Sequence, residues 1–163
     1  MSDVSMIGAR GPVTDPVGLL RRLLDLLPGR VLLLDADMVC GKEHIDAAVA
    51  HARRAFQYGS NDSEDMAMEV MLYASGERQL AKARSKMGVK EGEARVAIVL
   101  LDGELPPGVC ERLGLVRDDD VLAFSRQKAE RLGVASMELD LVPDDLAIGL
   151  VLERVAFVDV LKR

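Results

Sequence analysis

The chain has 163 residues, of which 49% are hydrophobic and 29% are charged, a composition typical of one globular domain and not of a disordered chain. Its net charge of −6 argues against a protein that coats nucleic acid over its whole surface, so any nucleic-acid contact must come from a local basic patch. Because only 3% of the residues are aromatic and Trp is absent, we expect an aliphatic core.

The cysteines and the apolar segments indicate a cytoplasmic protein that does not span a membrane. Cys40 and Cys110 form no CxxC pair, and the N-terminus lacks the continuous apolar stretch of a signal peptide. We therefore expect both to be reduced, buried thiols. The best candidate for a membrane span, 146–161, is interrupted by charged residues and is shorter than the roughly 20 apolar residues that a span needs.

The first third of the chain predicts two strands and two helices. Residues 4–9 predict a short edge strand, ended by Gly11 and Pro12. A helix is predicted over 16–27, since Asp15 is a favoured N-cap and Pro16 suits the first helical position. The continuous apolar run 31–34 predicts a central strand buried on both faces, and a helix is predicted over 42–58. The residues that we expect on the buried sides of the two helices are Leu19, Leu20, Leu23, Leu24 and Leu27 for the first, and Ile45, Val49, Ala52 and Phe56 for the second.

The rest of the chain continues as alternating helices and one strand. The elements predicted are a helix capped by Asp62 or Ser63 and ending near Ser75-Gly76, a basic helix from Glu77 to about Met87, a strand over 94–101, helices near 108–113 and 121–132, and a terminal helical segment that starts at Pro143. No repeat or long linker divides the chain. The predicted fold is α/β (α+β): a single layered domain over 1–163, with a small mixed or antiparallel sheet packed by several helices.

The basic helix is unusual in an acidic protein. Arg78, Lys82 and Lys86 are four residues apart, so they would form a cationic stripe about 12 Å long on one helix face. Gly76 would allow another molecule to approach the backbone, and the first turn of a restarted helix, with Arg78 and Gln79, favours an anion. The stripe predicts a phosphate-binding surface, and the alternative is an ordinary solvated helix face.

Catalytic and metal-binding patterns are weak. His44 and His51 lie about 10 Å apart along one predicted helix, too far to bind one metal ion together, and no Walker motif or HExxH motif occurs. No Ser or Cys stands in a nucleophile motif, so we predict no catalytic residue, no metal and no cofactor. The alternative left open is a small-molecule-binding or enzymatic α/β domain that uses the Gly41–His44 loop.

The terminal segment is apolar on nearly all sides, which is unlike a surface helix with one apolar stripe. We expect one side to lie on the core and another to contact a second protein. Two alternatives are a helix buried wholly in the core and a homodimer in which this helix pairs with itself.

Three stretches carry a family resemblance: DADMVCGKEHIDAAVAHARRAF, MEVMLYASGERQLAKARSKMGVKEG and LVLERVAFVDVL. In content and order they resemble the small regulatory subunit of the KEOPS complex, the family of the p53-related-kinase-binding protein (TPRKB). The resemblance implies a single α/β domain that is not an enzyme. It also implies binding to the complex's atypical kinase/ATPase subunit and to the 3′ CCA end of tRNA, during synthesis of N6-threonylcarbamoyladenosine.

The site residues follow from the resemblance and the basic segment together. The residues predicted to bind tRNA are Lys42, Ser75, Gly76, Arg78, Gln79, Lys82 and Lys86. The kinase-subunit interface is predicted to include Val151, Val155 and Val158. The chain departs from the family pattern at 138–145, which is longer and more acidic than expected between the last helices.

Overall fold

A computed structural model describes residues 4–27 and 29–162 of the protein. Its contacts divide the chain into two compact units, each built from two separate stretches of sequence. The first unit, called here the sheet unit, contains residues up to Asp37 and Gly88–Ala123. The second, called the helical unit, contains Met38–Met87 and the chain from Phe124 onward. A single domain over 1–163 stays a prediction.

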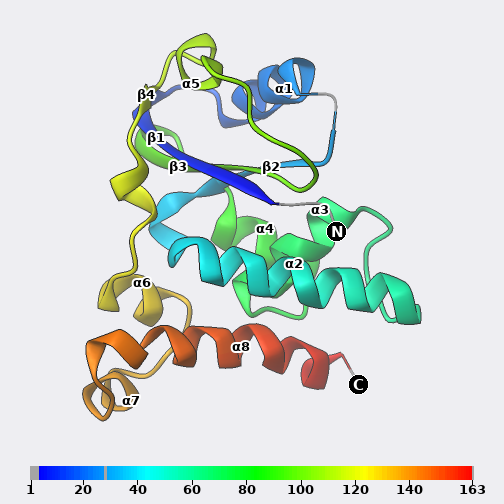
Figure 1. The fold of residues 1–163 in the computed structure, drawn as a ribbon, viewed down its shortest axis with the longest axis vertical. Helices are drawn as coiled ribbons and strands as arrows, with labels where there is room; N and C mark the ends of the chain where they lie inside the picture. Colours follow the sequence, from blue (N-terminus) through cyan, green and yellow to red (C-terminus); the bar gives the residue numbers. More distant parts are fainter. Residues whose placement is uncertain (1–3, 28, 163) are drawn as a thin grey trace. The chain divides into compact units, whose positions relative to one another are not determined.

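The sheet unit is built on four antiparallel strands in the order β2-β3-β1-β4 (Figure 1). The strands are β1 (Ser5–Val13), β2 (Val31–Asp35), β3 (Gly92–Leu100) and β4 (Val116–Arg117). A short 3₁₀ turn, η1 (Ala36–Met38), follows β2. The predicted α/β class is confirmed, and of the two predicted kinds of sheet the antiparallel one is present.

Two strand predictions were wrong in position. The strand predicted to end before Gly11 continues to Val13 and lies between β3 and β4. Pro12 is tolerated because β4 pairs only with Ala9 and Arg10, so β1 has a single neighbour at the proline. The strand predicted to be central, β2, lies at the edge of the sheet. All four of its apolar residues are nevertheless buried. An edge strand lacks a hydrogen-bonded neighbour on one side, but its side chains point to the two faces of the sheet and can still be covered there.

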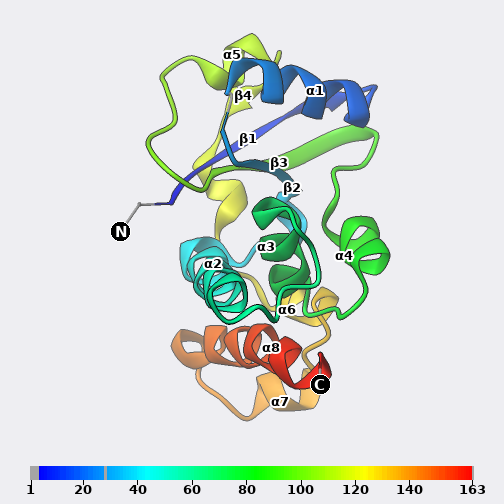
Figure 2. The ribbon, with the colours of Figure 1, turned by 90° about the vertical axis from the view of Figure 1, so that its right-hand side faces the viewer.

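Helices cover one face of this sheet. Figures 1 and 2 show α1 (Pro16–Leu26) and α5 (Val109–Arg112) on the same side of the strands, and η2 (Asp119–Leu122) follows β4. Asp15 caps α1 as predicted, by accepting a hydrogen bond from the Gly18 amide at 3.0 Å. Of the five leucines predicted on the buried side of α1, Leu20 and Leu24 are exposed, and the other three join the core.

The helical unit contains the remaining helices. They are α2 (Gly41–Tyr58), α3 (Met66–Ser75), α4 (Leu80–Met87), α6 (Arg126–Arg131), α7 (Ser136–Asp140), the 3₁₀ turn η3 (Asp144–Leu146) and α8 (Ile148–Leu161). Helix α8 packs against α2, α3 and α6. In both views α7 lies on the side of α8 that faces away from α2 (Figures 1 and 2).

Three helix starts differ from the predictions. Helix α3 is capped by Asp65 and not by Asp62 or Ser63. The basic helix starts at Leu80 instead of Glu77, because Gly76 ends α3 in the left-handed conformation (φ 72°) and the chain needs a turn before it can restart. The helix predicted over 121–132 is two pieces, η2 and α6, and Ser125 caps the second. None of the helices in the described part of the chain is long and apolar enough to cross a bilayer.

Candidate functional site

Helix α8 has two very different sides. Its buried residues are Val151, Val155 and Val158, each at most 1% exposed. Their spacing places them on one side of the helix, and Glu153, Phe157 and Val160 on the opposite side. Phe157 is 53% exposed and Val160 is 47% exposed. We call the side that carries Glu153, Phe157 and Val160 the outer face of α8.

Further apolar side chains are exposed near the start of α8. The exposed large apolar residues of α7, η3, α8 and the segment that joins them are Met137, Leu141, Leu146, Phe157, Val160 and Leu161. Scattered single apolar residues on a surface need no explanation, but a group of them on consecutive elements is typical of an interaction surface.

This geometry changes the predicted kinase interface. Val151, Val155 and Val158 lie in the core of the helical unit, so they cannot touch a partner while α8 keeps this packing. A partner of α8 would meet Phe157 and Val160 instead. The predicted core side of the terminal helix is present, and the predicted contact of its other side with a second protein stays a prediction.

A polar network ties the core side of α8 to α2 and α3. The Asp159 carboxylate accepts hydrogen bonds from the Tyr73 hydroxyl at 2.5 Å and from His51 Nδ1 at 2.9 Å. Burial and the bond to Asp159 raise the pKa of Tyr73, so this phenol stays protonated. Burial alone would raise the pKa of the Asp159 carboxyl group, but the hydrogen bonds from Tyr73 and His51 outweigh this effect, and the pKa is lowered.

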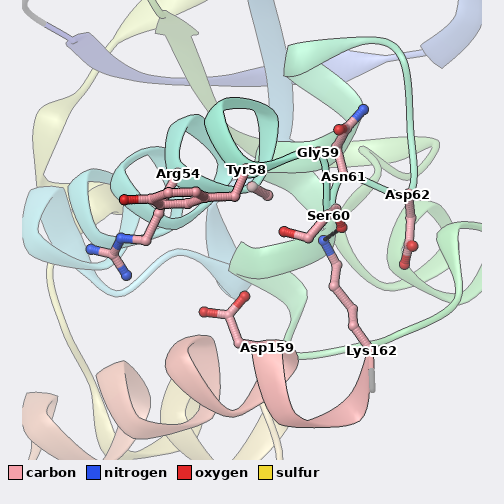
Figure 3. A pocket seen from close by; sticks show the side chains of 9 residues that line it. Arg54, Tyr58, Gly59, Ser60, Asn61, Asp62, Asp159 and Lys162 are labelled. Atoms are coloured by element: carbon pink, nitrogen blue, oxygen red, sulfur yellow. Dashed lines mark hydrogen bonds between the residues drawn. The ribbon is translucent and has the colours of Figure 1, made fainter.

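Lys162, just beyond α8, extends this network to the α2–α3 loop. Its ammonium pairs with the fully buried Glu69 and lies 4.5 Å from the centre of the Tyr73 ring. It also donates to the Ser60 carbonyl at 3.1 Å (Figure 3). Glu69 also accepts hydrogen bonds from the amides of Asp62 and Ser63. The Lys162–Glu69 pair was not predicted, since 93 residues separate its partners and no local pattern marks it.

Figure 3 shows the surface pocket beside this network. Its walls include Arg54 and Tyr58 from α2, the loop residues Ser60 and Asn61, and Asp159 from α8. Because the charged groups of Asp159 and Lys162 are already engaged by protein atoms, the pocket offers no free charged group from α8 to a ligand. We assign no ligand to it.

The basic segment is only partly available to a partner. The Lys86 ammonium donates to the Ser75 carbonyl at 3.0 Å and to the Leu132 carbonyl at 3.4 Å, and it pairs with Glu77. It therefore joins the C-terminal ends of α3 and α6, where backbone carbonyls lack helical partners. Ser75 is fully buried, and its hydroxyl donates to the Leu72 carbonyl. Both residues were predicted to bind tRNA, and the structure gives both a structural role.

The predicted helical stripe also loses Arg78, which precedes α4 together with Gln79. Arg78, Gln79 and Lys82 remain exposed. Arg154 from α8 lies beside Gly76, two residues before Arg78: a Cβ added at Gly76 would lie 3.8 Å from the Arg154 side chain, and a Cβ added at Gly133 would lie 2.6 Å from its guanidinium. We call Arg78, Lys82 and Arg154 the cationic patch. Arg154 was not among the predicted site residues, because nothing local in the sequence places it beside Gly76.

The segment Gly41–His44, predicted as a loop, is the first turn of α2, and its histidine has a structural role. His44 is fully buried, accepts a hydrogen bond from the Cys40 amide at Nδ1 (3.0 Å) and donates from Nε2 to the Ala74 carbonyl (2.8 Å). Burial lowers the pKa of His44 to about 4, against the opposing bond to Ala74. Since both ring nitrogens are occupied, His44 cannot take a proton from a substrate in this arrangement.

The N-cap residue Cys40 and Lys42 in this turn add no catalytic pair. Burial raises the pKa of the Cys40 thiol to about 11, although Lys128 opposes the shift, so Cys40 is a poor nucleophile. Lys42 pairs with Asp46 across one helical turn at 3.0 Å and is exposed enough to reach a partner. Among residues 4–27 and 29–162, no three His, Cys, Asp or Glu residues gather as ligands for a metal ion.

Comparisons with known proteins point to one family. A family model described as kinase binding protein CGI-121 matches residues 13–134. The regulatory protein Cgi121 of Methanocaldococcus jannaschii is 32% identical over 100 residues, which cover 61% of this chain and 64% of that relative. The matched part is therefore less than two thirds of the relative's length. Helices α7 and α8 lie beyond the residues that the family model matches.

Proposed function

Because the chain belongs to the CGI-121 family of kinase-binding proteins, the family that its three segments resemble, we propose that it is a non-catalytic, cytoplasmic subunit of the KEOPS complex. In this role it binds the atypical kinase/ATPase subunit and helps to hold the 3′ CCA end of tRNA. The complex as a whole then forms N6-threonylcarbamoyladenosine, and this chain supplies binding surfaces to it.

The outer face of α8 is the observation that carries the kinase contact. Phe157 is a large aromatic side chain that is half exposed to water, and aromatic residues at the centre of an interface contribute much of the binding energy. The helix is held on its other side by three buried valines and by Asp159. This packing presents Phe157 and Val160 on a fixed helix, so a partner need not order the helix when it binds.

The cationic patch supports contact with the tRNA end. A single-stranded CCA end offers phosphates and unstacked bases, which proteins bind with cationic and planar side chains. Arg78 and Arg154 supply guanidinium planes, and Lys82 supplies a point charge. Lys42 and Gln79 are exposed and Gly76 is half-buried. All three remain in the proposal as residues that contact a phosphate or a base of the tRNA end. Few phosphates can be reached and the chain is acidic, so its affinity alone should be modest and salt-dependent.

The kinase contact can be tested by one substitution on the outer face. Phe157→Glu should weaken binding to the kinase/ATPase subunit of the same organism by about 30-fold or more in titration calorimetry, because it places a charge in the apolar contact. The matched control is Val17→Glu, which adds the same charge to an exposed apolar residue of α1 (65% exposed). Equal affinities for the two variants would reject the outer face as the kinase-binding surface.

The tRNA contact needs a separate test. Arg78→Glu/Lys82→Glu should reduce binding of tRNA with an intact CCA end by about tenfold at 100 mM salt, through loss of phosphate contacts. Arg21→Glu/Arg30→Glu makes the same change in net charge on exposed residues of the sheet unit. If both double variants bind equally well, or if tRNA lacking its CCA end responds in the same way, the patch does not hold the tRNA end.

A further inference from the structure

The segment that contains the outer face of α8 is strongly acidic. Between Ser136 and Leu161 the sequence contains six acidic residues and one basic residue, Arg154, whereas the whole chain contains 27 and 21. The six acidic residues are Glu138, Asp140, Asp144, Asp145, Glu153 and Asp159. Two of them have defined partners, Asp140 with Arg126 and Asp159 with Tyr73 and His51. The other four are exposed.

The positions of these carboxylates relate them to the apolar side chains. Asp144 and Asp145 are the first two residues of η3, just before α8, and they precede the exposed Leu146. Glu153 lies one helical turn before Phe157 on the outer face itself. The positive end of the helix dipole accounts for acidic residues at the start of α8, but it does not account for Glu153, which lies near the middle of the helix.

We propose that the outer face of α8 docks into an apolar groove on its protein partner, and that Lys and Arg side chains rim this groove. Phe157 and Val160 fill the groove and Glu153 faces the basic rim, while Asp144 and Asp145, beside the first turn of α2, add negative charge at the start of the helix. This inference rests on the proposed kinase contact and adds the chemistry of the surface that the kinase must offer. A second copy of this chain is a poor occupant, because two such faces would bring like charges together.

Charge complementarity of this kind acts mainly on the rate of association. Opposite charges steer two proteins into contact over about one Debye length, which is about 10 Å at 0.1 M salt, whereas the apolar contact sets the rate of dissociation. The association rate constant with the kinase subunit should therefore fall about tenfold between 50 and 500 mM NaCl, while the dissociation rate constant changes little.

The test measures association with the kinase subunit by stopped-flow fluorescence. Asp145→Lys/Glu153→Lys should lower the association rate constant about tenfold at 50 mM NaCl and remove most of its salt dependence. Asp25→Lys/Glu111→Lys is the matched control, with the same change in net charge on two exposed residues of the sheet unit, and it should retain the salt dependence. Circular dichroism of each variant confirms that the helices are intact.

The outcomes separate this inference from the proposed function. If Phe157→Glu abolishes binding but both double variants associate equally fast, the acidic rim has no role and only this inference is overturned. If Phe157→Glu has no effect, the kinase contact on α8 fails first. Sedimentation of the chain alone provides a third outcome: a dimer that Phe157→Glu dissociates would make a second copy the occupant and would overturn the inference.

Discussion

Helices α3 and α8 have similar sequences in one respect and opposite surroundings in the structure. Both are apolar on nearly all sides, with no clear polar stripe. In α3, eight of ten residues are buried, and the unit surrounds the helix with α2, α4 and α8. In α8, three of fourteen residues are buried. Hydrophobic residues on all sides of a helix therefore do not show whether the helix is buried in the core or has an exposed apolar side that can bind a partner.

The polar contacts of α3 and α8 with the rest of the helical unit also differ. The end of α3 is fixed by bonds from His44 to the Ala74 carbonyl and from Lys86 to the Ser75 carbonyl. Helix α8 is bonded to α2 and α3 through Asp159. Two of the three predictions that follow pair a buried or engaged residue with an exposed one, and the other compares His44, which contacts α3, with His51, which contacts α8.

The largest expected effect comes from truncating a core residue of α3. Leu72 is fully buried, so Leu72→Ala should lower the free energy of unfolding by about 3 kcal/mol, the sum of lost burial and a new cavity. Phe157→Ala on the outer face of α8 should lower it by less than about 1 kcal/mol. Urea denaturation followed by circular dichroism measures both values. Comparable losses would mean that Phe157 is part of the core in solution.

The second effect is a pH dependence that His44 confers on the α2–α3 contact. The pKa of His44 is about 4 in the folded chain and about 6.5 when unfolded. Between these two pH values only the unfolded chain takes up the proton. The contribution of His44 to the free energy of unfolding is therefore fully present above pH 6.5 and is lost as the pH falls towards 4. The total loss from this group should be about 3 kcal/mol.

This pH dependence can be assigned to one histidine by substitution. Denaturation midpoints should be measured from pH 4 to pH 8 for the unmodified chain, His44→Gln and His51→Gln. His44→Gln should be less stable at pH 7 and should lose most of the slope between pH 6.5 and 4, whereas His51→Gln should retain it. A slope that survives in His44→Gln would show that other groups cause it.

The smallest effect separates two lysines of the basic segment. Lys86→Met keeps the side-chain stem but leaves the Ser75 and Leu132 carbonyls without this donor, and should cost about 1–2 kcal/mol of stability. Lys82→Met removes an exposed charge and should change stability by less than about 0.5 kcal/mol. The thermal midpoints of the two variants provide the measurement. If Lys86→Met is as stable as Lys82→Met, then Lys86 is free to bind a partner after all.

Local sequence patterns were sufficient to predict much of the fold and its class. Asp15-Pro16 and the leucines after it predicted α1, and the apolar runs predicted β2 and β3, because capping, proline geometry and periodicity act over a few residues. Both cysteines were predicted to be buried, and both are buried free thiols. The same patterns also carried the family resemblance, which the match to the CGI-121 family confirms.

Only the tertiary structure decided which side chains remain available to partners. It placed β2 at an edge, buried Ser75, engaged the Lys86 ammonium with two helix ends, brought Arg154 beside Gly76, and turned the three valines of α8 inward. The physical reason is that these outcomes depend on contacts between residues far apart in the sequence. The local sequence around a lysine is the same whether its ammonium is hydrated or bonded to two helix ends. The sequence of an apolar helix is likewise the same whether one side or every side of the helix is buried.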